Sequence, residues 1–331
     1  MQTIQIRLTK ELLKKAQELV NRGLYSNKSE VLRDSLRRLC FPEMNTSERM
    51  FQIIYSSDLH GNIVQYKKLF SRAIQIKADA IILGGDLLPK DKKNRTPKKQ
   101  KEFFEKKLLS LLEQFHKQNK KNCKVFLMLG NDDFKMSLNL LQKNEKKGHY
   151  QVIHNKCLKL HEGFKIIGYS YVPLTPFIHK DWEKLDLNEE NEMQVREDIV
   201  LKGDINSHSQ KKFDLKNRKD TIEKDLNRLL NKSHPRKTIL VTHSPPYNTS
   251  LDMISAKKHV GSRAVKKIIE NNQPLVSLHG HIHETIEFSG KFMEDIESSL
   301  SMSPGNDHIG KDLAIIEFNL YCPKKAKRIL L

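Results

Sequence analysis

The sequence predicts an α/β domain that follows a small strand-helix-helix unit, and three observations carry this prediction. The chain has 331 residues, 37% of them hydrophobic and 30% charged, which is enough to build a large core in a globular protein. From Phe51 onwards, short apolar stretches alternate with helical patterns, which is typical of α/β proteins. Residues 1–42 have a different pattern and are predicted to be a separate domain, followed by a polar linker at 43–50.

The first domain is predicted to contain one strand and two helices. Polar and apolar residues alternate over residues 3–8, as in a half-buried strand. Thr9 can cap a first helix, and Asn27 with Glu30 three residues later has the capping-box pattern of a second. About 40 residues bury too little surface to fold alone, so we expect a homodimer in which two copies pair their strands.

This arrangement resembles the ribbon-helix-helix family of DNA-binding proteins in Ile4, Ile6 and Leu8, in Gly23-Leu24-Tyr25, and in Asn27-Lys28-Ser29-Glu30 followed by Val31 and Arg33. The resemblance implies that the paired strands read base edges in the major groove and that the second helix presents its N-terminal amides to a phosphate. The DNA contacts it implies are Thr3, Gln5, Arg7, Asn27, Lys28 and Ser29. A dimerisation unit that does not bind DNA remains open as the alternative.

Six apolar stretches in the second domain, residues 51–331, are predicted to be strands. They lie at residues 51–57, 78–83, 125–129, 164–168, 238–241 and 274–278. A polar stretch, residues 181–236, interrupts the alternation, and only residues 221–230 within it have a clear helical pattern. We expect this stretch to be an insertion or a lid.

Residue types that bind metals recur where these predicted strands end. The motifs are Asp58-x-His60, Gly85-Asp86, Gly130-Asn131-Asp132, His243 and Gly280-His281-x-His283. Because ligands gather at the carboxyl ends of strands in α/β sheets, we expect the five motifs to converge. The i, i+2 spacing points both members of each Asp/His or His/His pair the same way along an extended chain.

Such a convergence favours a metal site, and a site for two divalent cations is what the family resemblance given next implies. Imidazole, carboxylate and amide oxygen without thiolate suit Mn, Fe, Zn, Co or Ni, and do not distinguish among them. Two cations outweigh the charge of Asp58 and Asp86, so the site would attract a phosphate. Cations about 3.5–4 Å apart can share a water and lower its pKa.

The order of the motifs resembles that of the calcineurin-like metallophosphoesterase superfamily, over residues 51 to about 306. The resemblance implies a four-layer α/β/β/α sandwich and a hydrolase that cleaves phosphomonoesters or phosphodiesters with a metal-activated water. Further stretches, among them residues 175–177, 259–262 and 303–306, are similar to a prokaryotic, mostly archaeal, branch.

The resemblance also assigns roles to individual residues. One cation would be held by Asp58, His60, Asp86 and His283, and the second by Asp86, Asn131, His243 and His281. Catalytic roles would fall to Asp86, Asn131, Asp132 and His243, while Asn62 and Asp133 would lie just behind the ligands. His149, His154 and His161 are expected to be structural, and His279 is expected to lie at a strand end or just behind the ligands.

Asp132 departs from the family pattern, in which many members have a histidine that assists the leaving group. Neighbouring cations lower the pKa of a carboxyl group, so Asp132 is expected to be ionised and unable to donate a proton. We therefore expect weaker catalysis on poor leaving groups, or protonation by water or another residue.

The net charge of +19 favours polyanionic partners, and a nucleotide or nucleic acid is the substrate class that we expect first. The densest basic run is residues 90–107. A Lys-rich proteome or solubility explains the charge equally well, and this alternative stays open.

The expected location is a reducing cytoplasm, because none of the four cysteines forms a Cys-x-x-Cys pair. No stretch approaches the ~18 apolar residues of a membrane span, and the first residues do not have the pattern of a signal peptide.

Two hypotheses on function follow from these patterns. The first is a metal-dependent phosphoesterase that its N-terminal domain brings to DNA. The second is a transcriptional regulator whose metallophosphoesterase domain acts as a sensor, and Asp132 alone supports it.

Overall fold

The structure, a computed structural model, describes residues 7–40, 50–90, 96–119, 122–177, 179–187, 201–203, 208–210 and 220–331. Of residues 37–40, 201–203 and 208–210 it describes the backbone alone. The chain divides into two compact units, Met1–Met50 and Phe51–Leu331. None of the helices in these ranges is both long enough and apolar enough to cross a membrane.

The first unit contains the two predicted helices, α1 (Lys10–Asn21) and α2 (Lys28–Cys40). The hydroxyl of Thr9 accepts a hydrogen bond from a first-turn amide and caps α1 as predicted. At α2, Asn27 Oδ1 accepts from the Glu30 amide at 2.9 Å. The Glu30 carboxylate accepts from the amide of Ser26 at 2.8 Å.

Apolar side chains of the first unit remain exposed. Leu12, Leu13 and Leu36 are 56%, 40% and 42% exposed. Arg7 is exposed and lies in no strand or helix, whereas Thr3 and Gln5, in the predicted strand, lie outside the described residues. The two helices of the ribbon-helix-helix pattern are therefore confirmed, and its strand stays a prediction.

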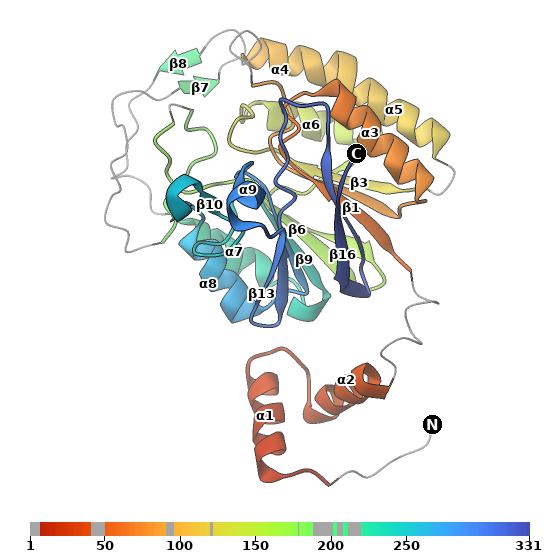
Figure 1. Ribbon diagram of the computed structural model, residues 1–331, viewed down its shortest axis with the longest axis vertical. Coiled ribbons are helices and arrows are strands. Elements are labelled where there is room, and N and C mark those ends of the chain that lie inside the picture. Colours follow the sequence, from red (N-terminus) through yellow and green to blue (C-terminus); the bar gives the residue numbers. More distant parts are fainter. Residues whose placement is uncertain are drawn as a thin grey trace. The chain divides into compact units, whose positions relative to one another are not determined.

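The second unit contains two six-stranded sheets within the described ranges (Figure 1). The first has the order β16 (Cys322–Leu330), β15 (Ala314–Asn319), β1 (Gln52–Ser56), β2 (Ala80–Gly84), β3 (Lys124–Met128) and β4 (Gln151–Val152). The second has the order β13 (Met293–Ile296), β14 (Ser299–Met302), β12 (Val276–His279), β9 (Thr238–Thr242), β6 (Phe164–Tyr169) and β5 (Lys156–His161). The six predicted strands are confirmed as β1, β2, β3, β6, β9 and β12.

Helices cover the outer face of each sheet. Over the first sheet lie α3 (Ile63–Gln75), α4 (Pro97–Phe103), α5 (Leu109–Gln118) and α6 (Ser137–Glu145), and over the second α7 (Ile222–Leu230) and α8 (Arg263–Asn272) (Figure 1). A π-helical turn, η1 (Phe104–Leu108), joins α4 to α5. The smaller elements are β7 (Leu201–Gly203), β8 (His208–Gln210), η2 (Pro235–Lys237), β10 (Met253–Ile254), η3 (Ser255–Lys257), β11 (Lys258–His259) and α9 (Thr285–Ser289).

Successive side chains of the central strands point to opposite faces of the sheets, and this produces three apolar layers. Ile54 and Ile81 pack under the helices of the first sheet, whereas their neighbours Ile53 and Ile82 face the second sheet. Leu240 of the second sheet faces the cluster that contains α7 and α8. Because successive side chains of a strand point to opposite faces, both sheets are buried on two sides, which gives the predicted α/β/β/α order.

The polar stretch 181–236 is buried at both of its ends. Trp182 is fully buried and its Nε1 donates to the carbonyl of Asp133 at 2.9 Å, while Leu226 and Leu229 of α7 belong to the core. Between these ends the structure describes only β7 and β8, which pair antiparallel. The lid therefore stays a prediction for residues 188–219 alone.

Candidate metal centre

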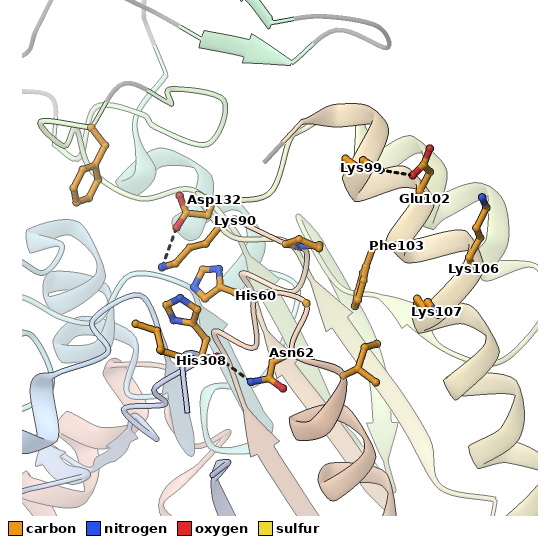
Figure 2. A pocket seen from close by; sticks show the side chains of 15 residues that line it. His60, Asn62, Lys90, Lys99, Glu102, Phe103, Lys106, Lys107, Asp132 and His308 are labelled. Carbon is orange, nitrogen blue, oxygen red and sulfur yellow. Dashed lines mark hydrogen bonds and ion pairs between the residues drawn. The ribbon is translucent and has the colours of Figure 1, made fainter. Parts of the chain in front are cut away.

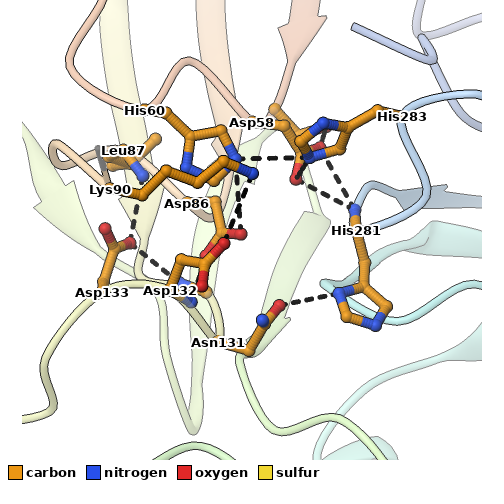
Figure 3. A network of polar contacts seen from close by, with 12 residues as sticks. Asp58, His60, Asp86, Leu87, Lys90, Asn131, Asp132, Asp133, His281 and His283 are labelled. Carbon is orange, nitrogen blue, oxygen red and sulfur yellow. Dashed lines mark hydrogen bonds and ion pairs between the residues drawn. The ribbon is translucent and has the colours of Figure 1, made fainter. Parts of the chain in front are cut away.

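A cavity of about 970 Å³ opens where the loops after β1, β2 and β3 meet α4 (Figure 2). His60, Asp132 and His308 line one side of it, and side chains of α4 and η1 line another. A buried network of carboxylates and imidazoles, which includes His60, lies where strands of both sheets end (Figure 3). This is the edge at which the sequence predicted convergence.

The backbone of this network is held in an unusual conformation. The amides of Asp58 and His60 donate to the carbonyls of Gly85 and Asp86, both at 2.9 Å, and so join the loops after β1 and β2. Asp58, His60, Asp86 and His281 have φ values of 58°, 43°, 52° and 71°. Residues other than glycine rarely adopt this left-handed region, and where they do they cluster at functional sites.

Asp58, His60, Asp86 and His283 approach one another on one side of the network (Figure 3). His60 Nε2 lies 3.3 Å from His283 Nε2 and 3.6 Å from Asp86 Oδ2. His283 Nε2 lies 3.5 Å from Asp58 Oδ1. The Asp58 carboxylate also accepts from the backbone amide of His281 at 3.1 Å, which ties the two sheets together.

Asn131, His243 and His281 form a second group around the same Asp86. Asn131 Oδ1 lies 3.0 Å from His243 Nε2 and 2.7 Å from His281 Nδ1, and Asp86 Oδ2 lies 3.4 Å from His243 Nε2. His243 Nδ1 donates to the carbonyl of Gly84 at 2.9 Å. This hydrogen bond orients the ring so that Nε2 faces Asp86. Histidines that bind metals are usually oriented in this way, by a hydrogen bond from their other ring nitrogen.

Burial and mutual attraction set the charge state of these groups. Burial alone would raise the pKa of Asp86, but His243 and His60 hold it well below its usual range. Burial lowers the pKa of His60, and lowers that of His281 to about 3, so both rings are neutral. Burial would lower the pKa of His243, but Asp86 and Asp58 raise it to about 9, so this ring must lose a proton to bind a metal ion, since ionised carboxylates and neutral imidazoles are the forms that bind.

The spacing of the donors fits two cations. The nitrogen and oxygen atoms that could bind a metal are 3.3–3.6 Å apart in four pairs, and these distances are long for hydrogen bonds. Ligands at about 2.0–2.2 Å from one ion lie about 3.0–3.6 Å apart. Asp58 and Asp86, exposed by only 2% and 1%, are buried carboxylates that such ions would neutralise.

Asn62 and Asp133 hold the loops around the network. The Asp133 carboxylate accepts from three backbone amides in the loops after β2 and β3, at 2.8–3.0 Å. Burial and the neighbouring Asp86 raise its pKa to about 8. The Asn62 side chain caps α3 and donates to the carbonyl of His308 at 2.9 Å. Both therefore position the network.

Asp132 lies at the edge between the network and the cavity. Its amide donates to Asp86 Oδ1 at 2.8 Å, and its Oδ2 lies 3.5 Å from Lys90 Nζ. The side chain thus faces the cavity from the position where a histidine was expected, with an ammonium group beside it.

His308 and Lys90 were missed as site residues. The His308 ring packs against His60 and His283, with centroids 4.4 and 5.1 Å apart, and ligand atoms of the three rings lie within 4.8 Å of one another. His308 follows Asn306 by two positions, and the Asn306 side chain donates to the carbonyl of Asp58 at 3.1 Å. The resemblance at residues 303–306 was the available signal.

The histidines expected to be structural, or to lie just behind the ligands, make packing and hydrogen-bond contacts. His154 Nδ1 accepts from a backbone amide at 3.1 Å, and His161 stacks on Phe51 with centroids 4.3 Å apart. Both ring nitrogens of His279 are hydrogen-bonded, at 2.9 Å, to hydroxyl groups within the second sheet. His149 lies 3.9 Å from a glutamate on α5.

A family model described as calcineurin-like phosphoesterase matches residues 51–285. The chain belongs to this family. Membership in this family implies a dinuclear site for divalent metals, which agrees with the clusters of aspartate and histidine donors described above.

Relatives of this calcineurin-like phosphoesterase support the fold. The uncharacterized protein MJ1162 of Methanocaldococcus jannaschii is 44% identical over 70 residues, which are 20% of this chain and 32% of that protein. The match thus spans about a third of this curated relative. The crystal structure of TT1561 of Thermus thermophilus has a TM-score of 0.53 at 18% identity, over 85% of this chain and 99% of that one. At this identity the likeness shows the fold alone.

Proposed function

We propose that this calcineurin-like phosphoesterase holds two divalent cations and hydrolyses phosphomonoesters or phosphodiesters. One observation carries the proposal: the buried Asp86 carboxylate is shared by two groups of nitrogen and oxygen donors whose spacing suits metal ions. The first ion would be held by Asp58, His60, Asp86 and His283, and the second by Asp86, Asn131, His243 and His281. When bound, two such ions polarise the phosphoryl group and lower the pKa of a water that they share.

The protein's own residues fix this geometry. Asp86 sets the distance between the two groups, and the carbonyl of Gly84 orients His243 through its Nδ1. The left-handed backbone at Asp58 and His60 directs both side chains to one point. Little reorganisation is then needed when a phosphate ester enters, because the donors are already in place.

Asp132 and Lys90 face the side where the family pattern puts the leaving group. A carboxylate in this position accepts hydrogen bonds and does not supply a proton. The Lys90 ammonium, 3.5 Å away, can stabilise negative charge that develops on the departing oxygen. Such stabilisation is less effective than proton transfer for strongly basic leaving groups.

The proposal is tested by measuring hydrolysis of bis-p-nitrophenyl phosphate with and without Mn²⁺. We expect turnover that a chelator abolishes and Mn²⁺ restores, with about two metal ions per chain by elemental analysis. Across a series of aryl phosphates, the rate should fall steeply as the leaving group becomes more basic, because Asp132 supplies no proton. Full metal loading without turnover would contradict the enzyme and favour the sensor hypothesis.

We infer further that the first unit dimerises and brings the enzyme to DNA. The exposed Leu12, Leu13 and Leu36 support a partner surface, and the net charge of +19 supports a polyanionic partner. Contacts from Thr3, Gln5, Arg7, Asn27, Lys28 and Ser29 belong to this proposal.

Replacing Arg7 by alanine is expected to weaken binding of double-stranded DNA about tenfold, and to reduce the dependence of affinity on salt. Fluorescence anisotropy at two salt concentrations measures both effects. Lys15→Ala is the control, because Lys15 is exposed on α1 and is paired with Glu18 at 3.8 Å. Unchanged affinity in Arg7→Ala would leave the unit as a dimeriser only.

A further inference from the structure

Apart from Lys90, the described lysines of the dense basic run at residues 90–107 are not used by the metal centre, yet some of them border the same cavity. Lys90 lines the cavity of about 970 Å³ beside His60 and Asp132, and Lys99, Lys106 and Lys107 line it from the side of α4 and η1 (Figure 2). The cavity therefore leads from the proposed reaction centre to a row of lysines on α4 and η1.

Within the described residues, the far part of this row is only partly compensated, because Glu102, which pairs with Lys99, is the carboxylate that also attracts Lys106. Lys90 lies 3.5 Å from Asp132, and Lys99 lies 3.3 Å from Glu102. Lys106 and Lys107 pair with no carboxylate within the described part of the chain. Uncompensated charge along a cleft attracts anions most strongly there.

The row is longer than one phosphate group. Lys99 and Lys106 are seven residues apart, which is about 10 Å along a helix that rises 1.5 Å per residue. The π-helical turn η1 contains both Lys106 and Lys107, and both line the cavity. Turns of this kind occur frequently at functional sites. The spacing suits a ligand with several phosphates.

Two aromatic side chains share the cavity with these lysines. Phe103 of α4 and Phe177 line it, and Phe177 is 56% exposed. Lysines beside exposed aromatic rings are the pattern that binds single-stranded nucleic acid, since the phosphates meet the ammonium groups and the bases stack on the rings. Inorganic polyphosphate would use the lysines but not the rings.

We propose that this cavity binds the nucleotides that adjoin the scissile phosphate of a single-stranded nucleic acid. Lys106 and Lys107 contact backbone phosphates, and a base stacks on Phe177. The inference rests on the proposed function, and it names the substrate of that site. In the reaction, water attacks phosphorus, one P–O ester bond breaks, and the proton of the water passes to the departing oxygen, giving a phosphomonoester and a hydroxyl group.

The test is binding of a fluorescent 12-nucleotide single strand to the full chain in the presence of a chelator, followed by anisotropy. In the double variant Lys106→Gln/Lys107→Gln we expect the dissociation constant to rise at least about tenfold. The slope of log affinity against log salt should fall by about 1.4, the value for two lost phosphate contacts to a single strand. Phe177→Leu, which keeps an apolar side chain, should raise the constant about fivefold or more.

The double variant Lys98→Gln/Lys101→Gln is the matched control. Both lysines are exposed on α4, which leads directly into η1, but they are not among the side chains that line the cavity. Their removal lowers the net charge by the same amount and should leave strand affinity unchanged. The control variant should also hydrolyse bis-p-nitrophenyl phosphate at the wild-type rate, because Lys98 and Lys101 do not line the cavity.

The outcomes separate the two proposals. Equal strand affinity in the cavity and control variants would overturn the inference, whether or not the enzyme turns over. Strand binding that depends on Lys106 and Lys107 but not on Phe177 would also overturn it, in favour of a ligand such as inorganic polyphosphate that has phosphates but no bases. Absence of metal-dependent turnover on every ester, with strand binding intact, would instead count against the proposed function alone.

Discussion

Replacing Asp86 by asparagine is expected to lower kcat/KM for bis-p-nitrophenyl phosphate by at least about 10³-fold, equivalent to about 4 kcal/mol of transition-state stabilisation. Asp86 Oδ2 lies 3.6 Å from His60 Nε2 and 3.4 Å from His243 Nε2, so one carboxylate faces both proposed ions. An amide keeps the shape but loses the charge and one donor oxygen. Elemental analysis should show that the metal content falls from two ions per chain to one or fewer.

The matched control is Asp186→Asn, which changes another buried aspartate. Asp186 accepts hydrogen bonds from the Ser262 hydroxyl and the Arg263 amide, at 2.5 and 2.6 Å, where α8 begins. This variant should unfold at a lower temperature yet keep both metal ions and most of its activity. If Asp86→Asn retained wild-type metal content and rate, the shared carboxylate would not have the role proposed for it.

Replacing Gly130 by alanine is expected to reduce activity about 10²-fold or more and to lower the melting temperature by several degrees. A methyl group there would lie 2.3 Å from Asp86 Oδ1, 2.5 Å from the Asp86 amide nitrogen and 2.6 Å from His243 Cε1. The backbone and the buried ring cannot move aside, so the donors themselves must shift. Overpacking of this kind costs about 1–3 kcal/mol, and a misplacement of about 1 Å costs about 10²-fold in rate.

Gly148→Ala is the control for Gly130→Ala. It distinguishes the effect of steric contacts with Asp86 and His243 from the loss of stability that replacing any glycine of positive φ would cause. Gly148 has a φ of 80°, but a methyl group there would meet nothing within 4 Å. This variant should lose about 1–2 kcal/mol from backbone strain and keep full activity. Thermal unfolding and steady-state kinetics on both variants give the comparison. Full activity in Gly130→Ala would show that the loop after β3 is looser than its contacts indicate.

The central strands were predictable because both of their faces are buried. β1, β2 and β9 each contain an uninterrupted apolar run, and every position of β12 is buried although it includes Ser277 and His279. β16 was missed because its Lys-rich sequence leaves every position except Ala326 exposed or partly exposed. A strand at the edge of a sheet pairs with its neighbour mainly through backbone hydrogen bonds. It therefore needs no apolar sequence pattern by which it could be predicted.

The donors of the metal centre were predictable for a different reason. Each follows a recognisable strand at a fixed offset, so sheet geometry brings them together. Lys90 and His308 follow no such rule. His308 reaches the network because Asn62 and Asn306 hold its loop, and these contacts join segments about 250 residues apart.

Residues 181–187 show how paired charges mislead a prediction from composition. The preceding Lys180 is buried, and its Nζ donates to both carboxylate oxygens of Glu183 at 2.8 and 3.0 Å. Trp182 between them is part of the core. A polar stretch suggested exposure, but satisfied ion pairs can be buried and cannot be recognised without their geometry.

The left-handed residues of the network set a limit on how stable this protein can become. Asp58, His60, Asp86 and His281 each hold a conformation that costs an ordinary residue about 1–2 kcal/mol. Glycine at these positions would relieve the backbone strain and raise the melting temperature. It would also remove the side chain that the backbone conformation directs towards the metal centre. Selection for thermal stability alone would therefore replace these residues by glycine. A related sequence that keeps them would indicate that activity at this site is still under selection.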